Sequence, residues 1–320
     1  MRILSLLLLV VALSAHQPAE NRYPESVKNA APKPCVSFTF DDGITTPQAH
    51  YAFETWNQML LQTMEEAGIK SVFFVTGANK LDEKGKFLLN SWAAAGHSLA
   101  NHSYTHPNFS QDKLTAQDFE MELQQTDQVI AAYPTYVKLF RFPYLKEGKS
   151  ADKIAQIRAV LAKHGYRNGY VTIDASDWFV NAQLLKSLQK NGPNDPNIEK
   201  YRDFYVKHIM DRANYYENLA YQLTNRHIKH TLLLHHNLSS ALFLDDLIQA
   251  FKQAGWDIAD ASQAFQDDIF KQLPTTVPAG ESLIWSLAKQ TGQYEAQLRY
   301  PAEDSRYELK AMKSLGLYQE

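Results

Sequence analysis

The sequence contains little cysteine and no excess of charge of either sign. Cys35 is the only cysteine among 320 residues, so the chain can form no internal disulfide and its fold must be held by core packing. Lys and Arg number 32 against 35 Asp and Glu, and a net charge of -3 gives no general field that would attract nucleic acid or an anionic membrane. The composition therefore argues against a polyanionic substrate and against a nucleic-acid partner.

Long apolar runs are also lacking, apart from one at the amino terminus. Arg2 is followed by an almost wholly apolar stretch, Ile3 to Leu13, and Ser14-Ala15 is compatible with a cleavage end, which is typical of a secretory signal peptide. The stretch is too short to span a bilayer. Leu13 is larger than the residue usually found three positions before the cut, so an uncleaved anchor stays an alternative. We expect a signal peptide at 1–15, a lead-in linker at 16–34 and no transmembrane span.

The remainder of the chain repeats one unit, in which a helix-period stretch, a glycine and a strand follow one another. One example is the spacing Phe53, Trp56, Leu60, Met64, which stops at Gly68 before a strand. Such alternation indicates a parallel sheet, either open or closed as a barrel. The absence of a glycine-rich phosphate loop after the first strand, and polar clusters after many strands, favour the barrel. We predict seven strands, near Val36, Ser71, Ser98, Tyr136, Gly169 (to Ile173), Thr231 and Trp256.

The last part of the chain breaks this rhythm. Prolines interrupt it, a short helix is expected over 281–290, and residues 300–304 are expected to form an ordered turn. Leu283, Ile284 and Leu287 give that helix an apolar stripe, so we expect it to pack on the barrel as an extension and not as a separate domain.

Two carboxylates end the first predicted strand, in the sequence Asp41-Asp42-Gly43. Adjacent negative charges at a buried strand end require a nearby cation, although the tripeptide alone would also suit an ordinary turn. His102 and His106 follow the third strand at a spacing of four, which on a helical turn would let both imidazoles reach one metal ion. With Asp42 they would make a three-ligand site with open coordination positions, the arrangement of a catalytic metal.

Three further polar clusters follow later strands. They are Arg141-Phe142-Pro143-Tyr144, the segment from Asp174 to Trp178, and Leu233-Leu234-His235-His236. Each alone could be a surface arginine, a capping aspartate or a core histidine. A barrel would place all five clusters on one face, which indicates a common site.

In this order the five clusters resemble the five motifs of the polysaccharide deacetylases of carbohydrate esterase family four, the nodulation-protein-B-like deacetylases. The resemblance covers residues 35–261 and implies a distorted (β/α) barrel of about seven parallel strands, with the barrel domain at 35–262 and a C-terminal helical extension at 263–320. It also implies a metal-dependent hydrolase that removes acetyl groups from an N-acetylated or O-acetylated polysaccharide or oligosaccharide, with Zn2+ as the expected ion and Co2+ or another divalent ion as the alternative. No protein partner is implied.

The resemblance also assigns roles to individual residues. It implies that Asp42, His102 and His106 hold the metal, with Asp41 as general base and Arg141 orienting that base. The backbone N–H of Tyr144 would bind the oxyanion, His235 would protonate the leaving group, and Asp177 would hold His235. The acetyl methyl group would lie between Trp178 and Leu233.

The chain departs from the family pattern at three places. Leu145 stands where the family often has glycine after the third motif, and His236 stands where it often has aspartate after the fifth-motif histidine. A further insertion at 181–201 is expected to form a loop that narrows or covers the substrate groove. Because side chains alternate along a strand, only one of His235 and His236 can face the site, and we expect it to be His235.

Three glycosylation sequons start at Asn101, Asn108 and Asn237, and two of them overlap the expected site, so a glycan there would block it. A bacterial periplasmic or secreted protein is therefore favoured. Two other functions stay open: the same machinery acting on a non-polysaccharide amide, as in a deformylase, or an inactive carbohydrate-binding homologue.

Overall fold

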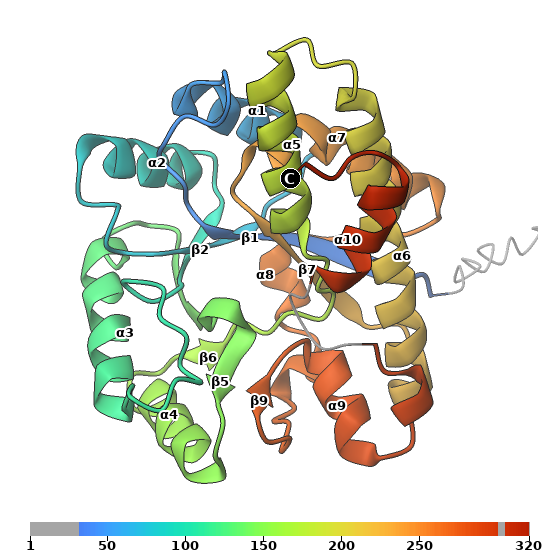
Figure 1. The fold of residues 1–320 in the computed structure, drawn as a ribbon. Coiled ribbons are helices and arrows are strands. Elements are labelled where there is room, and N and C mark those ends of the chain that lie inside the picture. The colour runs from blue at the N-terminus through green and yellow to red at the C-terminus, as the bar shows by residue number, and fades with distance from the viewer. Residues whose placement is uncertain (1–31, 300–304, 320) are drawn as a thin grey trace, which may run out of the picture. The chain divides into compact units, whose positions relative to one another are not determined.

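The computed structural model describes residues 32–299 and 305–319 (Figure 1). The predicted signal peptide, nearly all of the lead-in and the turn predicted at 300–304 lie outside the described residues. The described residues from 33 onward form one compact unit, which is described here by itself. Within the described ranges, no helix combines the length and the apolar character needed to cross a bilayer.

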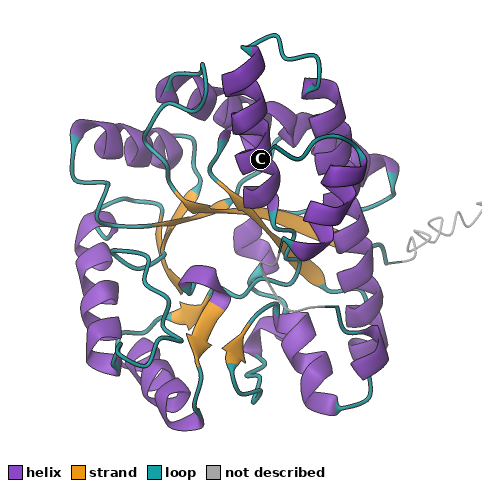
Figure 2. Cartoon of the chain, in the orientation of Figure 1, coloured by secondary structure: helices purple, strands orange, loops and turns teal. Residues whose placement is uncertain are grey.

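A parallel sheet of seven strands curls through the centre of this unit, as the orange arrows of Figure 2 show. The strand order is β6-β4-β3-β2-β1-β7, with β8 also paired to β1. This arrangement confirms the predicted distorted (β/α) barrel of about seven parallel strands. The strands are β1 (Cys35–Asp42), β2 (Val72–Val75), β3 (Ser98–Asn101), β4 (Tyr136–Phe140), β6 (Arg167–Asn168), β7 (Lys229–His235) and β8 (Asp257–Ile258).

Strand β1 is central and buried on both faces. Phe38 and Phe40 are fully buried in the apolar core on one face. On the other face, the hydroxyls of Ser37 and Thr39 donate to the carbonyl oxygens of His230 and Leu232 at 2.9 and 2.8 Å, so these buried polar groups are satisfied. The parallel register with β7 places Asp41 beside His235 at the ends of the two strands.

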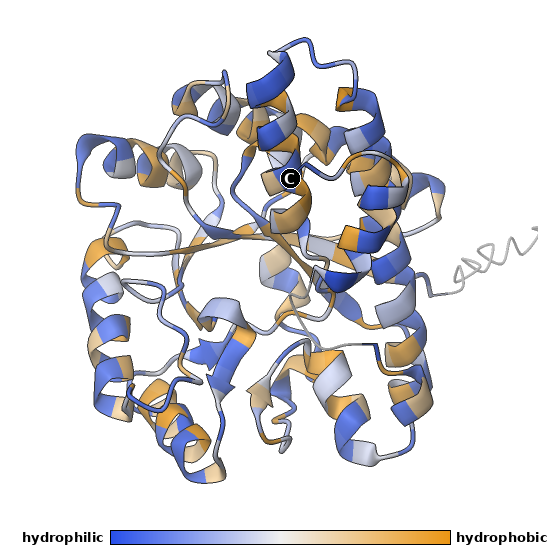
Figure 3. Ribbon diagram, in the orientation of Figure 1, coloured by the Kyte–Doolittle hydropathy of each residue, from blue (hydrophilic) through white to orange (hydrophobic). Residues whose placement is uncertain are grey.

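Eight helices surround the sheet in the described part of the barrel, with their apolar faces turned inward (Figure 3). The predicted spacing over 53–67 is confirmed, because Phe53, Trp56, Leu60 and Met64 are all fully buried on the first helix. The helices are α1 (Phe53–Glu66), α2 (Glu83–Ala94), α3 (Ala116–Ile130), α4 (Ala151–Lys163), α5 (Asp177–Asn191), α6 (Ile198–Thr224), α7 (Leu238–Gln253) and α8 (Ala261–Ala264).

The strand predicted at 169–173 is wrong. The sheet strand here is β6, which ends at Asn168, and beyond it only Ile173 makes an isolated bridge, to Leu232 of β7. The backbone N–H groups of Thr172 and Ile173 both donate to the carbonyl of Thr231, and the hydroxyl of Thr172 accepts from the N–H of Thr231 at 2.8 Å, so the bonding to β7 is irregular. The barrel therefore has an irregular seam between β6 and β7.

The covering loop predicted at 181–201 is also wrong. Helix α5 continues to Asn191 and α6 begins at Ile198, which leaves only 192–197 as a connection. Leu184 and Leu188 of α5 are fully buried in the core, so most of this insertion is packed structure and not a cover for a groove.

The C-terminal extension packs on this barrel. Leu283 and Ile284 are fully buried in the main core and Leu287 is partly buried against it, as the apolar stripe predicted. The boundary between domains at 262/263 stays a prediction. Strand β9 of the extension pairs with the short strand β5 (Lys146–Gly148), which follows η1 (Pro143–Leu145). The elements of the extension are η2 (Asp268–Lys271), β9 (Ala279–Gly280), α9 (Leu283–Thr291), η3 (Glu295–Gln297) and α10 (Arg306–Ser314).

Candidate active site

The carboxyl ends of the parallel strands bring most of the predicted site residues to one edge of the sheet. Asp41 and Asp42 end β1, and His235 ends the neighbouring strand β7. His102 directly follows β3, and Arg141 directly follows β4. Residues from separate parts of the chain therefore meet here because parallel strands end on the same side.

Asp42, His102 and His106 form the candidate metal site. One potential ligand atom from each lies within 4.8 Å of the other two, and no other group of three such side chains occurs among the described residues. The Nε2 atoms of His102 and His106 lie 3.6 and 3.4 Å from Oδ1 of Asp42.

The predicted helical turn that carries the two histidines is wrong. Residues 102–106 form a loop in which Ser103 and His106 have left-handed backbones, with φ of 67° and 60°. The loop is fixed by its own polar groups, since the backbone N–H of His106 donates to Oγ of Ser103 at 3.1 Å. The carboxylate of Glu122 accepts from two further N–H groups of the loop at 2.7 Å. The imidazoles thus converge through loop geometry and not through helical spacing.

The protonation states at these residues suit a divalent cation. Nδ1 of His102 lies 2.8 Å from the carbonyl oxygen of Arg141 and must donate to it. The lone pair of Nε2 is therefore available on the side that faces Asp42. Burial lowers the pKa of His102 to about 3, so the ring is neutral at neutral pH. Oδ1 of Asp42 is buried without a hydrogen-bond partner, a costly arrangement that a bound cation would relieve. The donor set therefore fits a metal ion.

Asp41 faces a different partner. Nη1 of Arg141 donates to Oδ1 of Asp41 at 2.6 Å. The guanidinium is itself held in place, since its Nε donates to the carbonyl of Gly169 at 2.9 Å and its central carbon lies 3.9 Å from the centroid of the Phe74 ring. Burial raises the pKa of Asp41 to about 6 although Arg141 acts in the opposite direction. A carboxylate with a pKa near 6 is well matched to accept a proton at neutral pH.

His235 is held by Asp177, as the sequence predicted. Nδ1 of His235 lies 2.6 Å from Oδ1 of Asp177, and its backbone N–H donates to Oδ2 of the same carboxylate at 2.9 Å. Asp177 is fully buried at the first position of α5, and the side chain of Asn237 donates to it at 3.2 Å. Three donors thus fix the carboxylate, and the carboxylate fixes the imidazole.

His236 is part of the core. Its ring is fully buried, with ring centroids 4.3 Å from Trp56 and 5.3 Å from Phe73, and its Nε2 lies 3.0 Å from Oδ1 of Asn57. Burial lowers the pKa of His236 well below its ordinary value, so it is neutral. The two neighbouring histidines thus contact different elements, in agreement with alternation along the strand.

The remaining predicted residues are Leu233, Tyr144 and Trp178. Leu233 is buried against Leu145 and Val171. Tyr144 is 46% exposed, and its ring centroid lies 4.7 Å from that of His106. Trp178 follows Asp177 on α5 and is partly buried.

Lys80 is a residue near the site that the sequence analysis missed. It is only 1% exposed, and burial lowers its pKa to about 7 although Asp42 acts in the opposite direction. Gly43, with φ of 85°, makes room for it, since a Cβ at this position would lie 2.6 Å from Cε of Lys80. The sequence around it looks like a surface loop, so nothing in the pattern would have indicated a buried lysine.

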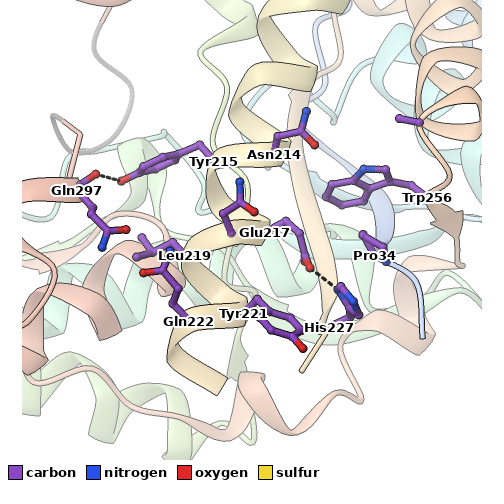
Figure 4. Close-up of a pocket in the computed structure, with 12 residues that line it drawn as sticks. Pro34, Asn214, Tyr215, Glu217, Leu219, Tyr221, Gln222, His227, Trp256 and Gln297 are labelled. Atoms are coloured by element: carbon purple, nitrogen blue, oxygen red, sulfur yellow. Dashed lines mark hydrogen bonds and ion pairs between the residues drawn. The ribbon is translucent and has the colours of Figure 1, made fainter. Parts of the chain in front are cut away.

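A cleft of about 780 Å3 lies elsewhere (Figure 4). It runs along α6 past Tyr215, Glu217 and Tyr221, and its other walls include Pro34 and Trp256, which precede β1 and β8. It contains none of the predicted site residues and lies near the amino ends of the strands, whereas the candidate site lies at their carboxyl ends.

Comparison with protein families supports these observations. Residues 28–169 match the family model of polysaccharide deacetylases, a range that includes β1 to β6 and the first three of the five clusters.

Two curated relatives are also similar over part of the chain. A peptidoglycan-N-acetylglucosamine deacetylase of Bacillus cereus is 28% identical over 110 residues, which is 34% of this chain and 36% of that protein. A chitooligosaccharide deacetylase of Sinorhizobium fredii is 29% identical over 150 residues, 45% of this chain and 60% of that protein. The chain thus matches between about a third and three fifths of the length of these relatives.

Solved structures show a similar fold. A mutant of a CE4 family pseudoenzyme with restored enzymatic activity aligns with a TM-score of 0.51 at 20% identity, covering 72% of this chain and 67% of that one. A peptidoglycan N-acetylglucosamine deacetylase in complex with a naphthalenyl-benzamide compound aligns with a TM-score of 0.50 at 19% identity, covering 73% of this chain and 89% of that one. At these identities the similarity concerns the fold alone.

Proposed function

We propose that this chain, whose residues 28–169 match the family model of polysaccharide deacetylases, is a divalent-metal-dependent hydrolase of acetyl groups on a polysaccharide or oligosaccharide. The observation that carries the proposal is the meeting of three sets of residues at one sheet edge. They are the metal-site residues Asp42, His102 and His106, the pair Asp41 and Arg141, and the pair His235 and Asp177.

A metal ion held by Asp42, His102 and His106, for which we propose Zn2+ with Co2+ as the alternative, would lower the pKa of a bound water and polarise the acetyl carbonyl. One carboxylate and two neutral imidazoles are ligands that suit these ions. Three protein ligands would leave room for water and substrate.

Asp41 is proposed as the general base. Its carboxylate is ionised above a pKa of about 6 and takes the proton of the attacking water. Arg141 orients this carboxylate through the 2.6 Å hydrogen bond and is itself fixed by Gly169 and by the Phe74 ring. The base is therefore rigid before substrate binds, which reduces the reorganisation needed in the transition state.

Tyr144 and His235 are proposed to act on the tetrahedral intermediate. The backbone N–H of Tyr144 would donate to the oxyanion. His235 would give its proton to the departing amine or alcohol, and Asp177, which accepts from Nδ1, would stabilise the charged imidazole. Trp178 and Leu233 are proposed to enclose the acetyl methyl group.

We also propose that the protein is exported, to the periplasm or outside the cell, from a bacterial host. This proposal rests on the signal-like pattern at 1–15 and on the sequons that overlap the site. It is tested by sequencing the amino terminus of the protein recovered from the periplasm.

The experiment that tests the function measures acetate release from chitin fragments, peptidoglycan and acetylated xylan in parallel. We expect chelation to abolish release and added Zn2+ or Co2+ to restore it. His102→Ala should lose metal and turnover together, whereas His97→Asn, which changes a buried histidine outside the site, should keep both. Full activity in metal-free protein would refute the proposed mechanism, and no release from any substrate would refute the substrate class.

A further inference from the structure

The C-terminal extension lies across the irregular seam of the barrel. In this seam, the segment 169–173 lacks a regular strand partner, and the extension binds two of its carbonyl groups. The backbone N–H of Leu283 donates to the carbonyl of Val171 at 2.7 Å, and the hydroxyl of Ser282 donates to that of Thr172 at 2.9 Å. The extension therefore satisfies backbone groups that the sheet leaves open.

The same stretch of the extension also holds the loop that carries Tyr144. Strand β9 pairs antiparallel with β5, with Gly280 opposite Lys146. The backbone N–H of Glu281 donates to the carbonyl of Leu145 at 3.0 Å, and its carboxylate forms an ion pair with Lys146. The loop is thus connected by hydrogen bonds and by charge to residues more than 130 positions later in the chain.

This loop has an unfavourable backbone and needs such support. Tyr144 and Leu145 both have left-handed backbones, with φ of 56° and 54°. For a residue other than glycine this conformation costs about 1–2 kcal/mol, and it persists only where the surroundings fix it. Position 145 is occupied by leucine, so the chain lacks the glycine that would adopt this turn without strain. Its side chain is buried against Val171 and Leu233, and its carbonyl is held by the extension.

Gly280 allows the extension to approach this closely. A Cβ at Gly280 would lie 1.8 Å from the carbonyl oxygen of Leu145 and 2.9 Å from its carbonyl carbon, and φ is 130°. Neither backbone atom can move without displacing the loop. Any side chain at 280 must therefore push Leu145, and Tyr144 beside it, away from their present positions.

We propose that Gly280 and Glu281 of the C-terminal extension are positioning residues that hold the Tyr144 loop in its catalytic conformation. They keep the Tyr144 ring beside His106, at 4.7 Å, and aim the Tyr144 backbone N–H; the catalytic consequence of that placement rests on the proposed function. The extension thereby completes the active site from outside the region that matches the family.

The test compares Gly280→Ala with Gly292→Ala. Both glycines belong to the extension and have positive φ, 130° for Gly280 and 69° for Gly292, but a Cβ at Gly292 would have no atom within 4 Å, so the control carries the milder strain of a left-handed backbone without the collision. Gly280→Ala should lower kcat for acetate release by about tenfold to a hundredfold, with KM and bound metal close to those of the control. Hydrogen exchange followed by mass spectrometry should show faster exchange in a peptide covering 142–148 for Gly280→Ala only.

A milder variant keeps the inference testable if Gly280→Ala does not fold. Glu281→Gln retains the backbone hydrogen bond to Leu145 and removes the charge that pairs with Lys146. It should therefore speed hydrogen exchange in the same peptide and lower kcat by a smaller factor than Gly280→Ala does. Glu281→Asp, which keeps the charge, should restore part of the loss in kcat. Exchange and kcat equal to those of the Gly292→Ala control, in the variants that fold, would overturn the inference. The exchange measurement needs no turnover, so it decides the positioning claim even if the wild-type protein releases no acetate and the proposed function fails.

Discussion

Asp41 and Asp42 are consecutive residues whose carboxylates contact different groups. Oδ1 of Asp41 lies 2.6 Å from Nη1 of Arg141, whereas Oδ1 of Asp42 lies 3.4 Å from Nε2 of His106. Asp42 has φ of 77°, so the backbone leaves the extended conformation there. This turn allows two adjacent carboxylates to face different partners.

We predict that Asp41→Asn and Asp42→Asn fail in different ways. Asp41→Asn should retain metal and lose about 10²–10⁴ in rate, because only proton transfer is removed. Asp42→Asn should lose metal affinity, because a ligand is removed. Metal content by mass spectrometry, measured beside acetate release, checks both. If Asp41→Asn lost metal as readily as Asp42→Asn, the division of roles between the two carboxylates would be wrong.

The two neighbouring histidines should differ in rate and in stability. His235→Ala should lower the rate by about 10²–10⁴ for an amide, whose amine must be protonated to leave, and much less for an activated ester. His236→Ala should leave the rate per folded molecule nearly unchanged but lower the free energy of unfolding by about 2–4 kcal/mol, because it empties a fully buried site among aromatic rings. Urea unfolding and kinetics on both substrates separate the two. Loss of the alkaline limb of the pH-rate profile in His236→Ala alone would assign the acid to His236.

Removal of the chain from residue 278 onward should destabilise the barrel. Leu283, Ile284, Met312 and Leu317 are at most 1% exposed in the main core, and deleting them would expose the core surface they cover. We expect an insoluble product or a melting temperature lower by about 10 °C or more, since each kcal/mol shifts the melting temperature of a chain this size by about 2–4 °C. A shortened protein that stays soluble and melts at the wild-type temperature would make the extension a detachable appendage.

Stability should fall in mild acid because of buried histidines. Burial, with a smaller contribution from Lys70, lowers the pKa of His97 to about 4 from 6.5, and Nδ1 of the neutral ring accepts from the backbone N–H of Ser71 at 3.1 Å. Between these pH values the unfolded chain binds the proton and the folded chain does not, so the free energy of unfolding rises with pH from about 4 to 6.5. His97 alone would contribute up to roughly 3 kcal/mol of this rise.

His97→Asn offers the matched control for that slope. The amide oxygen can accept from Ser71 as the imidazole does but cannot bind the proton. The variant should therefore show a shallower dependence of unfolding free energy on pH between 4 and 6.5. An unchanged slope would mean that other groups produce the acid sensitivity.

The sequence was sufficient to predict the barrel and the meeting of the five clusters, because these depend on local patterns. The apolar spacing that buries Trp56 and Leu60 is visible within one helix, and the acids of β1 end a recognisable strand. The parallel arrangement then places every strand end on one side. The different surroundings of His235, beside Asp177, and His236, in the core, agree with simple alternation along the strand.

The features that could not be predicted depend on partners distant in the chain. The segment 181–191 is helical partly because buried polar groups find such partners: Asn181 accepts from the N–H of Ser239 at 3.0 Å, and Gln183 accepts from that of Gln319 at 2.8 Å. The loop at 102–106 depends on left-handed residues that no spacing rule indicates. Lys80 is buried beside Gly43 and Asp42, which come from the end of β1.

The position of the lone thiol makes the chain convenient for metal measurements. Cys35 begins β1 and Asp42 ends it, and at about 3.3 Å per residue the two are roughly 23 Å apart. Sulfur is a strong ligand for zinc and often obscures stoichiometry in cysteine-rich proteins, but a single thiol at the far end of the strand cannot join the donor set at Asp42. A fluorescent label on Cys35 would likewise stand clear of the site, although burial raises the pKa of this thiol and labelling will need alkaline buffer.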